Sequence, residues 1–260
     1  MNVLITAGGT TENIDPVRKI KNTATGRLGS LIAEEFVKQG KNQISNIFYV
    51  CEKGTIIPNL PCLKVNLVSG VNETKCTLTK LLTDNKIDAV IHSMAVSDYT
   101  VDSVTTVDDL AEFISQKLFS HKEDFQTERS LTEFITGCIK ENNRLLDNDK
   151  KISSNVNNLM LLLKQTPKLL SMIKKLQPSA ILVGFKLLSG VKKQYLIDVG
   201  YELLQKNDCD FVLANDSLNI SNDHHIAYLI SPDKSYIQFQ TKEEIAHGIV
   251  QKILNMVDKR

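Results

Sequence analysis

The chain has 260 residues, a length that accommodates one large domain or one domain with an appendage. Apolar residues make up 42% of the chain and charged residues 23%, which excludes a mainly disordered, a collagenous or a disulfide-stapled protein. Its 31 Lys and Arg residues nearly balance 30 Asp and Glu residues, so the net charge of +1 gives no global attraction to nucleic acid or to an anionic membrane.

The first residues, Met1 to Ala7, run straight into an apolar segment with no basic leader and no long hydrophobic stretch. We therefore expect a cytoplasmic protein. The five cysteines are odd in number and contain no C-x-x-C pair, which favours reduced, mostly buried thiols over a zinc site or a set of disulfides.

Short β-branched runs alternate with helical periodicity along the first hundred residues. This alternation predicts an α/β fold, with a mostly parallel sheet that is doubly wound, meaning that helices cover both of its faces. Strands are predicted at 3–6, 44–50, 63–67 and 88–92, and helices at 28–40 and 74–82.

The middle of the chain, from Asp102 to Asp149, is polar and contains no convincing strand. Apolar residues recur at helical spacing in 110–118 and in 131–145. We interpret 102–149 as a helical insertion or an enlarged loop within a single domain that spans 1–260.

The α/β alternation then returns. Thr166 is predicted to cap a helix that starts at Pro167, and Thr241 with Glu244 forms a capping box before the last helix. Between them the sequence predicts strands at 180–185 and 210–214, a helix at 194–205, and a late β-hairpin with arms 226–230 and 236–239 around Pro232-Asp233.

The first predicted strand ends in a glycine-rich turn that contains Gly8 and Gly9. Free backbone N–H groups in such a turn can cradle an anion, and an ordinary tight turn is the alternative. The chain contains neither the G-x-G-x-x-G spacing of a dinucleotide site nor a P-loop.

The segment from Asp15 to Gly29 is rich in small and hydrogen-bonding residues at the entry to a helix. Arg18 can pair with a carboxylate or phosphate in a bidentate way, and the amide of Asn22 can donate to a developing oxyanion. The alternative is simple capping of the helix by Thr23 or Thr25, with Arg18 in solvent.

The fourth predicted strand leads into the segment His92 to Tyr99 at the carboxyl edge of the sheet, where open α/β folds bind ligands. Asp98 is a candidate for Mg²⁺ bound to phosphates or for a nucleotide. A hydrolase triad of His92, Ser93 and Asp98 is disfavoured, because adjacent strand residues point to opposite faces. His224 and His225 lack metal-site spacing and are interpreted as a surface pair.

Positive charge is concentrated in one part of this neutral chain. Residues 150–193 contain nine lysines and no Asp or Glu, whereas 107–149 contain ten acidic residues against five basic ones. Most of these lysines, Lys174 included, are expected on solvated helix faces. Lys151 and Lys186 lie beside apolar, strand-like segments and are better placed to meet a polyphosphate. Phe185 can supply a flat wall for a base, and an ordinary core phenylalanine is the alternative.

Several motifs, taken in order, resemble those of the phosphopantothenoylcysteine synthetases, also called phosphopantothenate-cysteine ligases, of coenzyme A biosynthesis. The chain is most similar to the bacterial enzymes of the streptococcal type, in which no decarboxylase domain precedes the ligase. The motifs are ITAGGTTE at 5–12, DPVR at 15–18, N-x-x-x-G-x-x-G at 22–29, HSMAVSDY at 92–99, KISS at 151–154, KQTPK at 164–168, VGFK at 183–186 and AND at 214–216.

The resemblance implies a Rossmann-like fold and a two-step ligation. The carboxylate of 4'-phosphopantothenate attacks the α-phosphate of CTP and releases pyrophosphate, and the amine of L-cysteine then displaces CMP from the acyl-CMP intermediate to form an amide. It further implies a homodimer that uses Mg²⁺, without a flavin, a nucleic acid or a membrane as partner. Phosphoryl chemistry of this kind depends mostly on positioning and electrostatics.

The resemblance also implies roles for single residues. Asn22 matches the asparagine that holds the acyl intermediate, Arg18 an arginine of the same substrate segment, and Lys151 the lysine of a mobile flap over the triphosphate. Further nucleotide positions are Gly8, Gly9, Ala95, Asp98, Gly184, Phe185 and Lys186, and further substrate positions are Thr25, Gly26 and Asn215.

Three alternatives stay open at this stage. The animal enzymes of the family also carry a Phe-Lys pair and use ATP, so ATP is an alternative to CTP. A Rossmann-like reductase is disfavoured, because the second strand is followed only by Glu52 as a candidate ribose ligand. A nucleotide-binding module without ligase activity would leave Arg18, Asn22 and Lys151 together without a purpose.

Overall fold

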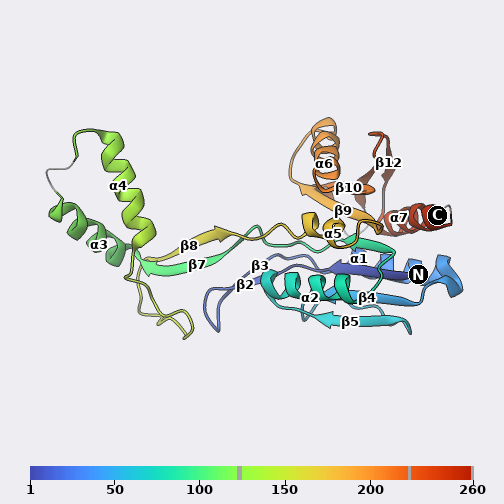
Figure 1. Cartoon of the computed structure of the whole chain (residues 1–260), viewed down its shortest axis with the longest axis horizontal. Helices are drawn as coiled ribbons and strands as arrows, with labels where there is room; N and C mark the ends of the chain where they lie inside the picture. Colours follow the sequence, from blue (N-terminus) through green and yellow to red (C-terminus); the bar gives the residue numbers. More distant parts are fainter. Residues whose placement is uncertain (122–124, 222–223, 259–260) are drawn as a thin grey trace. The chain divides into compact units, whose positions relative to one another are not determined.

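The computed structural model describes residues 1–121, 125–221 and 224–258 (Figure 1). Its strands are β1 (Asn2–Ala7), β2 (Thr11–Asn13), β3 (Lys19–Lys21), β4 (Asn46–Cys51), β5 (Leu63–Leu67), β6 (Ala89–His92), β7 (Tyr99–Thr106), β8 (Leu159–Gln165), β9 (Ile181–Leu188), β10 (Phe211–Ile220), β11 (His225–Ile230) and β12 (Tyr236–Phe239). Its helices are α1 (Arg27–Gly40), a short 3₁₀ helix (Lys41–Gln43), α2 (Gly70–Asp84), α3 (Val107–Ser120), α4 (Glu128–Glu141), α5 (Leu170–Leu176), α6 (Lys193–Asn207) and α7 (Lys242–Val257). Within these residues, no helix combines the length and the apolar character that a membrane span requires.

The large sheet has the strand order β12-β11-β10-β9-β6-β1-β4-β5. The pairs from β10 through β5 are parallel, whereas β10 with β11 and β11 with β12 are antiparallel. Each predicted strand of this sheet is present, and the late hairpin forms its edge. The predicted mostly parallel α/β sheet is thereby confirmed.

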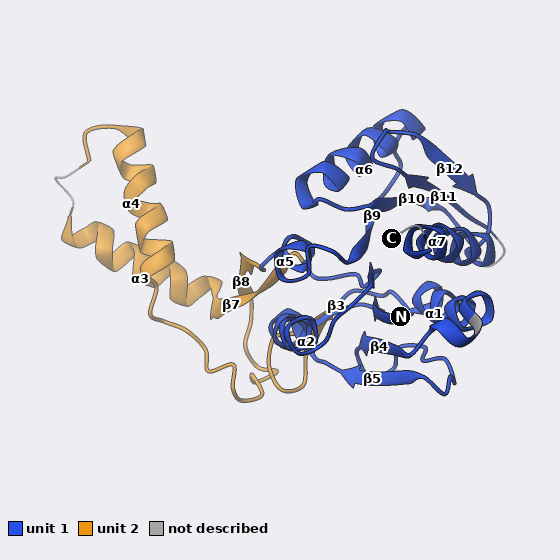
Figure 2. Cartoon of the chain, turned by 45° about the vertical axis from the view of Figure 1, so that its right-hand side comes forward, with its two compact units in different colours: residues 1–11, 21–97, 167–260 blue, residues 12–20, 98–166 orange. Residues whose placement is uncertain are grey.

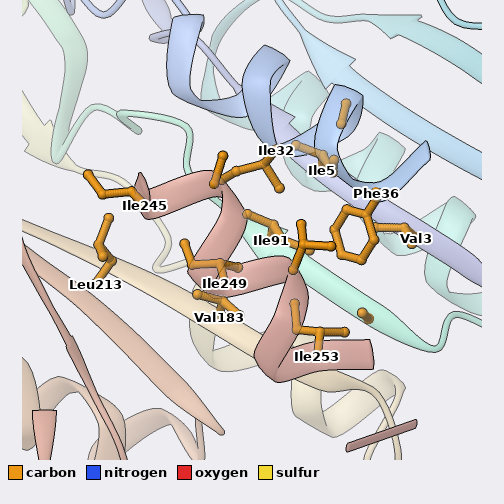
Figure 3. Close-up of a cluster of buried hydrophobic side chains, with 14 of the residues drawn as sticks. Val3, Ile5, Ile32, Phe36, Ile91, Val183, Leu213, Ile245, Ile249 and Ile253 are labelled. Carbon is orange, nitrogen blue, oxygen red and sulfur yellow. The ribbon is translucent and has the colours of Figure 1, made fainter. Parts of the chain in front are cut away.

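Both faces of this sheet are buried. Ile5 of β1 belongs to a cluster with α1 and α7, and its neighbour Leu4 belongs to a cluster with α2, α5 and α6. Side chains alternate between faces along a strand, so continuous apolar strands require helices on both sides. Figure 3 shows the first cluster, in which Ile249 and Ile253 of α7 lie beside Phe36 of α1 and the strand residues.

The chain divides into two compact units, drawn in separate colours in Figure 2. Unit 1 contains 1–11, 21–97 and 167–260 and includes the large sheet, and unit 2 contains 12–20 and 98–166. Unit 2 is built on the antiparallel pair of β7 and β8, with α3 and α4 between these strands in the sequence. That 1–260 acts as one ligase domain remains a prediction.

The expectation of no strand between Asp102 and Asp149 is wrong at its beginning. Helices α3 and α4 lie where helical spacing was found, but β7 continues through Thr106. Its partner β8 pairs Leu159 with Thr106 and Gln165 with Tyr99, more than fifty residues along the chain. A polar strand is recognisable only by that distant pairing, because its own alternation is weak.

The predicted start of a helix at Thr166-Pro167 is also wrong, since α5 begins at Leu170. The N–H of Thr166 donates to the carbonyl of Asp98 at 3.0 Å and continues the pairing of β7 with β8. The Thr241 cap is confirmed by a 3.1 Å bond from the N–H of Glu244. The Glu244 carboxylate accepts a hydrogen bond from the N–H of Gln240, at 2.7 Å. In the predicted capping box it would accept one from the N–H of Thr241 instead.

The cluster in Figure 3 generates a test of the fold. Ile249 is fully buried, and Ile249→Ala leaves a cavity between α7 and the sheet that we expect to lower the free energy of unfolding by about 2–5 kcal/mol. The control is Ile237→Ala on the edge strand β12, where the side chain is 40% exposed and the loss is clearly smaller. Urea unfolding of both variants measures the difference, and equal losses would contradict the assigned core.

Candidate functional site

The glycine turn after β1 is joined to the loop after β6 by backbone hydrogen bonds. The carbonyl of Gly8 accepts the N–H of Ala95 at 2.8 Å, and the carbonyl of Ala95 accepts the N–H of Thr10 at 3.1 Å. Gly8 has a φ of +79°, which favours glycine. Both loops leave the carboxyl edge of adjacent parallel strands, where open α/β sheets bind ligands.

Asn22 lies against this junction and is half-buried. Its side-chain Nδ2 donates to the carbonyl of Ala95 at 2.8 Å, and its backbone N–H donates to the carbonyl of Thr10 at 3.2 Å. A Cβ on Gly9 would lie only 2.9 Å from the Cβ of Asn22, so glycine is required there by close packing. The structure thus brings Gly8, Gly9, Asn22 and Ala95 together.

The residues that follow Asn22 lead into α1. Thr25 is exposed, its carbonyl accepts the N–H of Ile56 at 3.0 Å, and its Oγ1 accepts the N–H of Arg27 at 3.4 Å. Gly26 has a φ of +81°, and a Cβ there would approach the backbone nitrogen of Gly8 to 3.2 Å. The capping alternative for Thr25 is therefore present, and Gly26 lies beside the glycine turn.

Glu52, which the sequence offered only as a candidate ribose ligand, has a structural role at this site. It is buried, and its carboxylate accepts the N–H of Thr11 at 2.6 Å, the Oγ1 hydroxyl of Thr11 at 2.5 Å and the N–H of Gly70 at 2.9 Å. It thereby fixes the end of the glycine turn to the start of α2. Because both oxygens are used inside the protein, Glu52 is not placed to bind a ribose, which weighs further against the reductase alternative.

The side chains of His92 and Ser93 each form a hydrogen bond with Thr6. The Nδ1 of His92 lies 3.0 Å from the Oγ1 of Thr6, and the Oγ of Ser93 donates to the Thr6 carbonyl at 2.7 Å. Burial lowers the pKa of His92 to about 4, so its imidazole is neutral at physiological pH. A buried neutral histidine that does not bond the serine gives no hydrolase triad.

Asn215 of β10 forms a buried pair with His225 of β11, with 3.0 Å between Nδ2 and Nε2. The interpretation of His225 as a surface residue is wrong, since it is only 6% exposed, whereas His224 is exposed. Asp216, also buried, accepts the N–H groups of Val191, Leu218 and Gly190, and these bonds lower its pKa below the ordinary range. The end of β10 is thereby held in place.

The residues of β9 are placed by packing. Gly184 is buried, and a Cβ there would lie 3.2 Å from Leu170 and 3.3 Å from the Sγ of Cys209. Phe185 and Lys186 are half-buried on opposite faces of the strand, and Phe185 contacts the first core cluster. A side chain at position 184 would thus press on α5 and on Cys209.

One lysine of the basic stretch, Lys174, does not lie on a solvated helix face as expected. The side chain of Lys174 on α5 is only 12% exposed and pairs with Asp210 at 2.8 Å. Asp210 also accepts the N–H of Leu182 at 2.8 Å. Lys174 therefore serves the packing of unit 1.

Arg18 and Lys151 come together within unit 2. They line a hollow of about 350 Å³ with Ile152, Ser153, Ser154, Val156 and Leu159. Lys151 is exposed, and the segment around it is neither helix nor strand, so the expected strand-like character is wrong there. Asp98, also in unit 2, is exposed and does not line this hollow.

The described residues contain no group of three His, Cys, Asp or Glu side chains that converges as a metal site.

Residues 1–108 and 144–257 match the family described as the DNA/pantothenate metabolism flavoprotein C-terminal domain. The match includes every predicted site residue and leaves out 109–143, which contain most of α3 and the whole of α4.

Two similar proteins are named coenzyme A biosynthesis bifunctional protein CoaBC. That of Thermococcus kodakarensis is 27% identical over 256 residues, which are 98% of this chain and 51% of the relative. That of Methanocaldococcus jannaschii is 29% identical over 259 residues, again 98% of this chain and 51% of the relative. The chain thus spans about half the length of these curated relatives.

Solved structures show the same fold. The DNA/pantothenate metabolism flavoprotein from Streptococcus pneumoniae is 32% identical with a TM-score of 0.79, covering 98% of this chain and 99% of that one. A Cab2 mutant in complex with phosphopantothenate-cysteine is 17% identical with a TM-score of 0.67, covering 99% of this chain and 86% of that one. The second likeness supports the fold alone.

Buried His92 generates a prediction about pH. The unfolded chain binds a proton at this histidine as the pH falls through about 6.5, whereas the folded chain binds it only near 4. The unfolded state then holds more protons, so the free energy of unfolding falls as the pH drops from 6.5 to 4, by up to about 1.4 kcal/mol per pH unit. We expect His92→Asn, which keeps a polar partner for Thr6, to flatten this slope in denaturant titrations.

The control for this measurement is His224→Asn, because His224 is exposed. It is expected to leave the slope of the wild-type protein unchanged. Parallel pH profiles for the wild type and His92→Asn would contradict the assignment of a neutral buried imidazole.

Proposed function

Because the chain belongs to the DNA/pantothenate metabolism flavoprotein C-terminal domain family, we propose that it is a phosphopantothenate-cysteine ligase of coenzyme A biosynthesis. The reaction joins 4'-phosphopantothenate and L-cysteine to give 4'-phosphopantothenoylcysteine. The names of the CoaBC relatives support the assignment to coenzyme A biosynthesis. The observation that carries the proposal is the Asn22 amide, held at the junction of two loops on the carboxyl edge of the sheet.

The first step of the proposed reaction activates the carboxylate of 4'-phosphopantothenate. A carboxylate oxygen attacks the α-phosphorus of CTP, the bond to the β-phosphate oxygen breaks, and pyrophosphate leaves. The product is an acyl-CMP anhydride. This step needs neutralisation of phosphate charge more than a protein nucleophile, and Arg18 and Lys151 line one hollow that can provide it.

The second step forms the amide. The amine of L-cysteine attacks the acyl carbon, the tetrahedral intermediate collapses, CMP leaves and the amine loses its proton. Asn22 is suited to the oxyanion of this intermediate, because an amide nitrogen has two hydrogens and the carbonyl of Ala95 occupies one. Its position is fixed before the reaction, as electrostatic stabilisation requires.

The nucleotide is proposed to bind at the carboxyl edge of unit 1, at Gly8, Gly9, Ala95, Gly184, Phe185 and Lys186. Asp98 remains a further proposed nucleotide residue. CTP is the proposed nucleotide and ATP the alternative. Mg²⁺ held mainly by the phosphates would neutralise charge on the leaving pyrophosphate, and no flavin is required. Thr25, Gly26 and Asn215 are proposed to bind 4'-phosphopantothenate.

The organisation of the protein is part of the proposal. We propose one ligase domain, acting as a homodimer in the cytoplasm, in which the helical insertion is the part of 102–149 that contains α3 and α4. The absence of 109–143 from the family match supports the insertion. Sedimentation analysis of the purified protein tests the dimer, and a monomer at the concentrations of the assay would overturn it.

A single assay tests the ligase. Purified protein is incubated with Mg²⁺, 4'-phosphopantothenate, cysteine and either CTP or ATP, and pyrophosphate and product are followed by mass spectrometry. We expect amide product with CTP at a rate well above that with ATP. Reversed nucleotide preference would support the ATP alternative, whereas nucleotide binding without any amide would favour a non-catalytic module.

Two variants separate the two chemical steps. Asn22→Ala is expected to release pyrophosphate but to accumulate acyl-nucleotide, with amide formation slowed about 100-fold through the loss of one oxyanion donor. Lys151→Ala is expected to slow pyrophosphate release itself, because it removes charge from the hollow. Quenched-flow mass spectrometry distinguishes the two defects.

Each variant has a control that removes the same type of side chain elsewhere. Lys150→Ala removes the neighbouring lysine, which pairs with Asp147 at 2.8 Å and does not line the hollow. Asn72→Ala removes an exposed amide on α2. Loss of all intermediate formation in Asn22→Ala would move Asn22 from the second step to substrate binding.

A further inference from the structure

Asp15 is a buried carboxylate in unit 2 that the proposed chemistry does not yet use. It lies in the turn between β2 and β3 and is 1% exposed. Its Oδ1 accepts the N–H of Val17 at 2.8 Å and the N–H of Arg18 at 2.7 Å. Its Oδ2 lies 3.4 Å from the Nε of Arg18 and accepts the N–H of Ile152 at 3.3 Å.

Arg18 also forms a hydrogen bond with Ile152. A terminal guanidinium nitrogen of Arg18 donates to the carbonyl of Ile152. Ile152 therefore has its N–H bonded by Asp15 and its C=O bonded by Arg18, and its side chain is 4% exposed. One residue of an irregular segment is held at both of its peptide groups, directly beside Lys151.

This contact explains how two cations can line one hollow. The guanidinium of Arg18 and the ammonium of Lys151 are like charges, and like charges repel. Burial alone would raise the pKa of Asp15, but the N–H groups of Arg18, Val17 and Ile152 and the charge of Arg18 lower the pKa below its ordinary value. An ionised carboxylate thus lies between the cationic segments and holds both.

We propose that Asp15 is a positioning residue that fixes the Lys151 segment against Arg18, so that both cations bind the phosphates of the nucleotide as one unit. The inference deepens the proposed ligase function and rests on it for the identity of the ligand. Asp15 itself does not touch the reacting atoms. Its contribution is the geometry of the two residues that do.

The informative variant is Asp15→Asn, which keeps the shape of the side chain. The retained oxygen can still accept the N–H groups of Val17 and Arg18. The new amide group replaces Oδ2 and faces the N–H of Ile152 and the Nε of Arg18. All three groups are hydrogen-bond donors, so neither contact can form. The substitution therefore breaks the contact to the Lys151 segment and leaves the turn of Asp15 intact.

The first measurement needs no nucleotide and no activity. The chain contains no tryptophan, so Ser154→Trp places a single fluorophore in the exposed part of the Lys151 segment. We expect Asp15→Asn in this background to increase the acrylamide quenching constant about twofold. Asp147→Asn is the matched control, because that exposed carboxylate accepts the Lys150 ammonium and the N–H of Asp149 but does not contact Ile152. Equal quenching in both variants overturns the proposal.

The second measurement is kinetic, in the protein without the tryptophan. Asp15→Asn is expected to raise the KM for the nucleotide about tenfold, with the KM for cysteine and kcat changed less than threefold. A fall in kcat alone, with an unchanged nucleotide KM, overturns the positioning role. If the wild-type protein makes no amide, the ligase function fails, and the quenching experiment still decides whether Asp15 holds the segment.

A third measurement covers the case in which Asp15→Asn does not fold. In the wild-type protein, the amide of Ile152 lies outside any helix or strand. Its bond to Asp15 is expected to slow its hydrogen exchange at least about tenfold relative to the amide of Ser153, measured by NMR at pH 6–7. Exchange of Ile152 as fast as that of Ser153 overturns the proposal.

Discussion

The junction between Gly8, Thr10 and Ala95 is the constraint on which the site of unit 1 depends. Two loops that leave adjacent parallel strands are joined there by the backbone alone, through bonds of 2.8 and 3.1 Å. Glycine is required at Gly8 by its φ of +79° and at Gly9 by the close approach of Asn22. Asn22 then binds the same Ala95 carbonyl, at 2.8 Å, so the orientation of its amide follows from the junction. The Glu52 carboxylate, with both oxygens occupied, joins Thr11 at the end of the glycine turn to Gly70 at the start of α2.

The large sheet could be predicted from the sequence because its strands are buried on both faces. A strand such as Ala89–His92 is apolar at almost every position, and this property is local. The antiparallel pair of unit 2 could not be predicted in this way. Tyr99–Thr106 alternates polar and apolar residues weakly, and Leu159–Gln165 is rich in leucine, which also favours helices. Their strand conformation comes from pairing across a long stretch of chain, which no local pattern contains.

The candidate site was predictable in its residue types but less so in its contacts. The resemblance of motifs identified Arg18, Asn22 and Lys151, and the structure brings Asn22 to the glycine turn and Arg18 to Lys151. The contacts of the acidic residues were not predicted, because Glu52 was considered only as a ribose ligand and Asp15 only as part of a motif. A buried carboxylate is costly unless its oxygens are satisfied, and the partners of Glu52 and Asp15 are mostly backbone N–H groups, which every residue carries. Sequence patterns cannot reveal such partners, although an acid directly after a buried strand, as at Glu52, is a usable signal.

The same reasoning explains why a neutral chain can concentrate positive charge at one place. Arg18 and Lys151 line a common hollow, where their like charges repel each other. An exposed acid would offset this repulsion only weakly, because water and salt screen exposed pairs. Asp15 is 1% exposed and is bonded to the backbone of both cationic segments, so it counters the repulsion with little screening. A carboxylate placed in this way stays clear of an incoming phosphate, because its oxygens are occupied by the protein. The local charge balance therefore organises the two cations without filling the position that they are proposed to offer to the nucleotide.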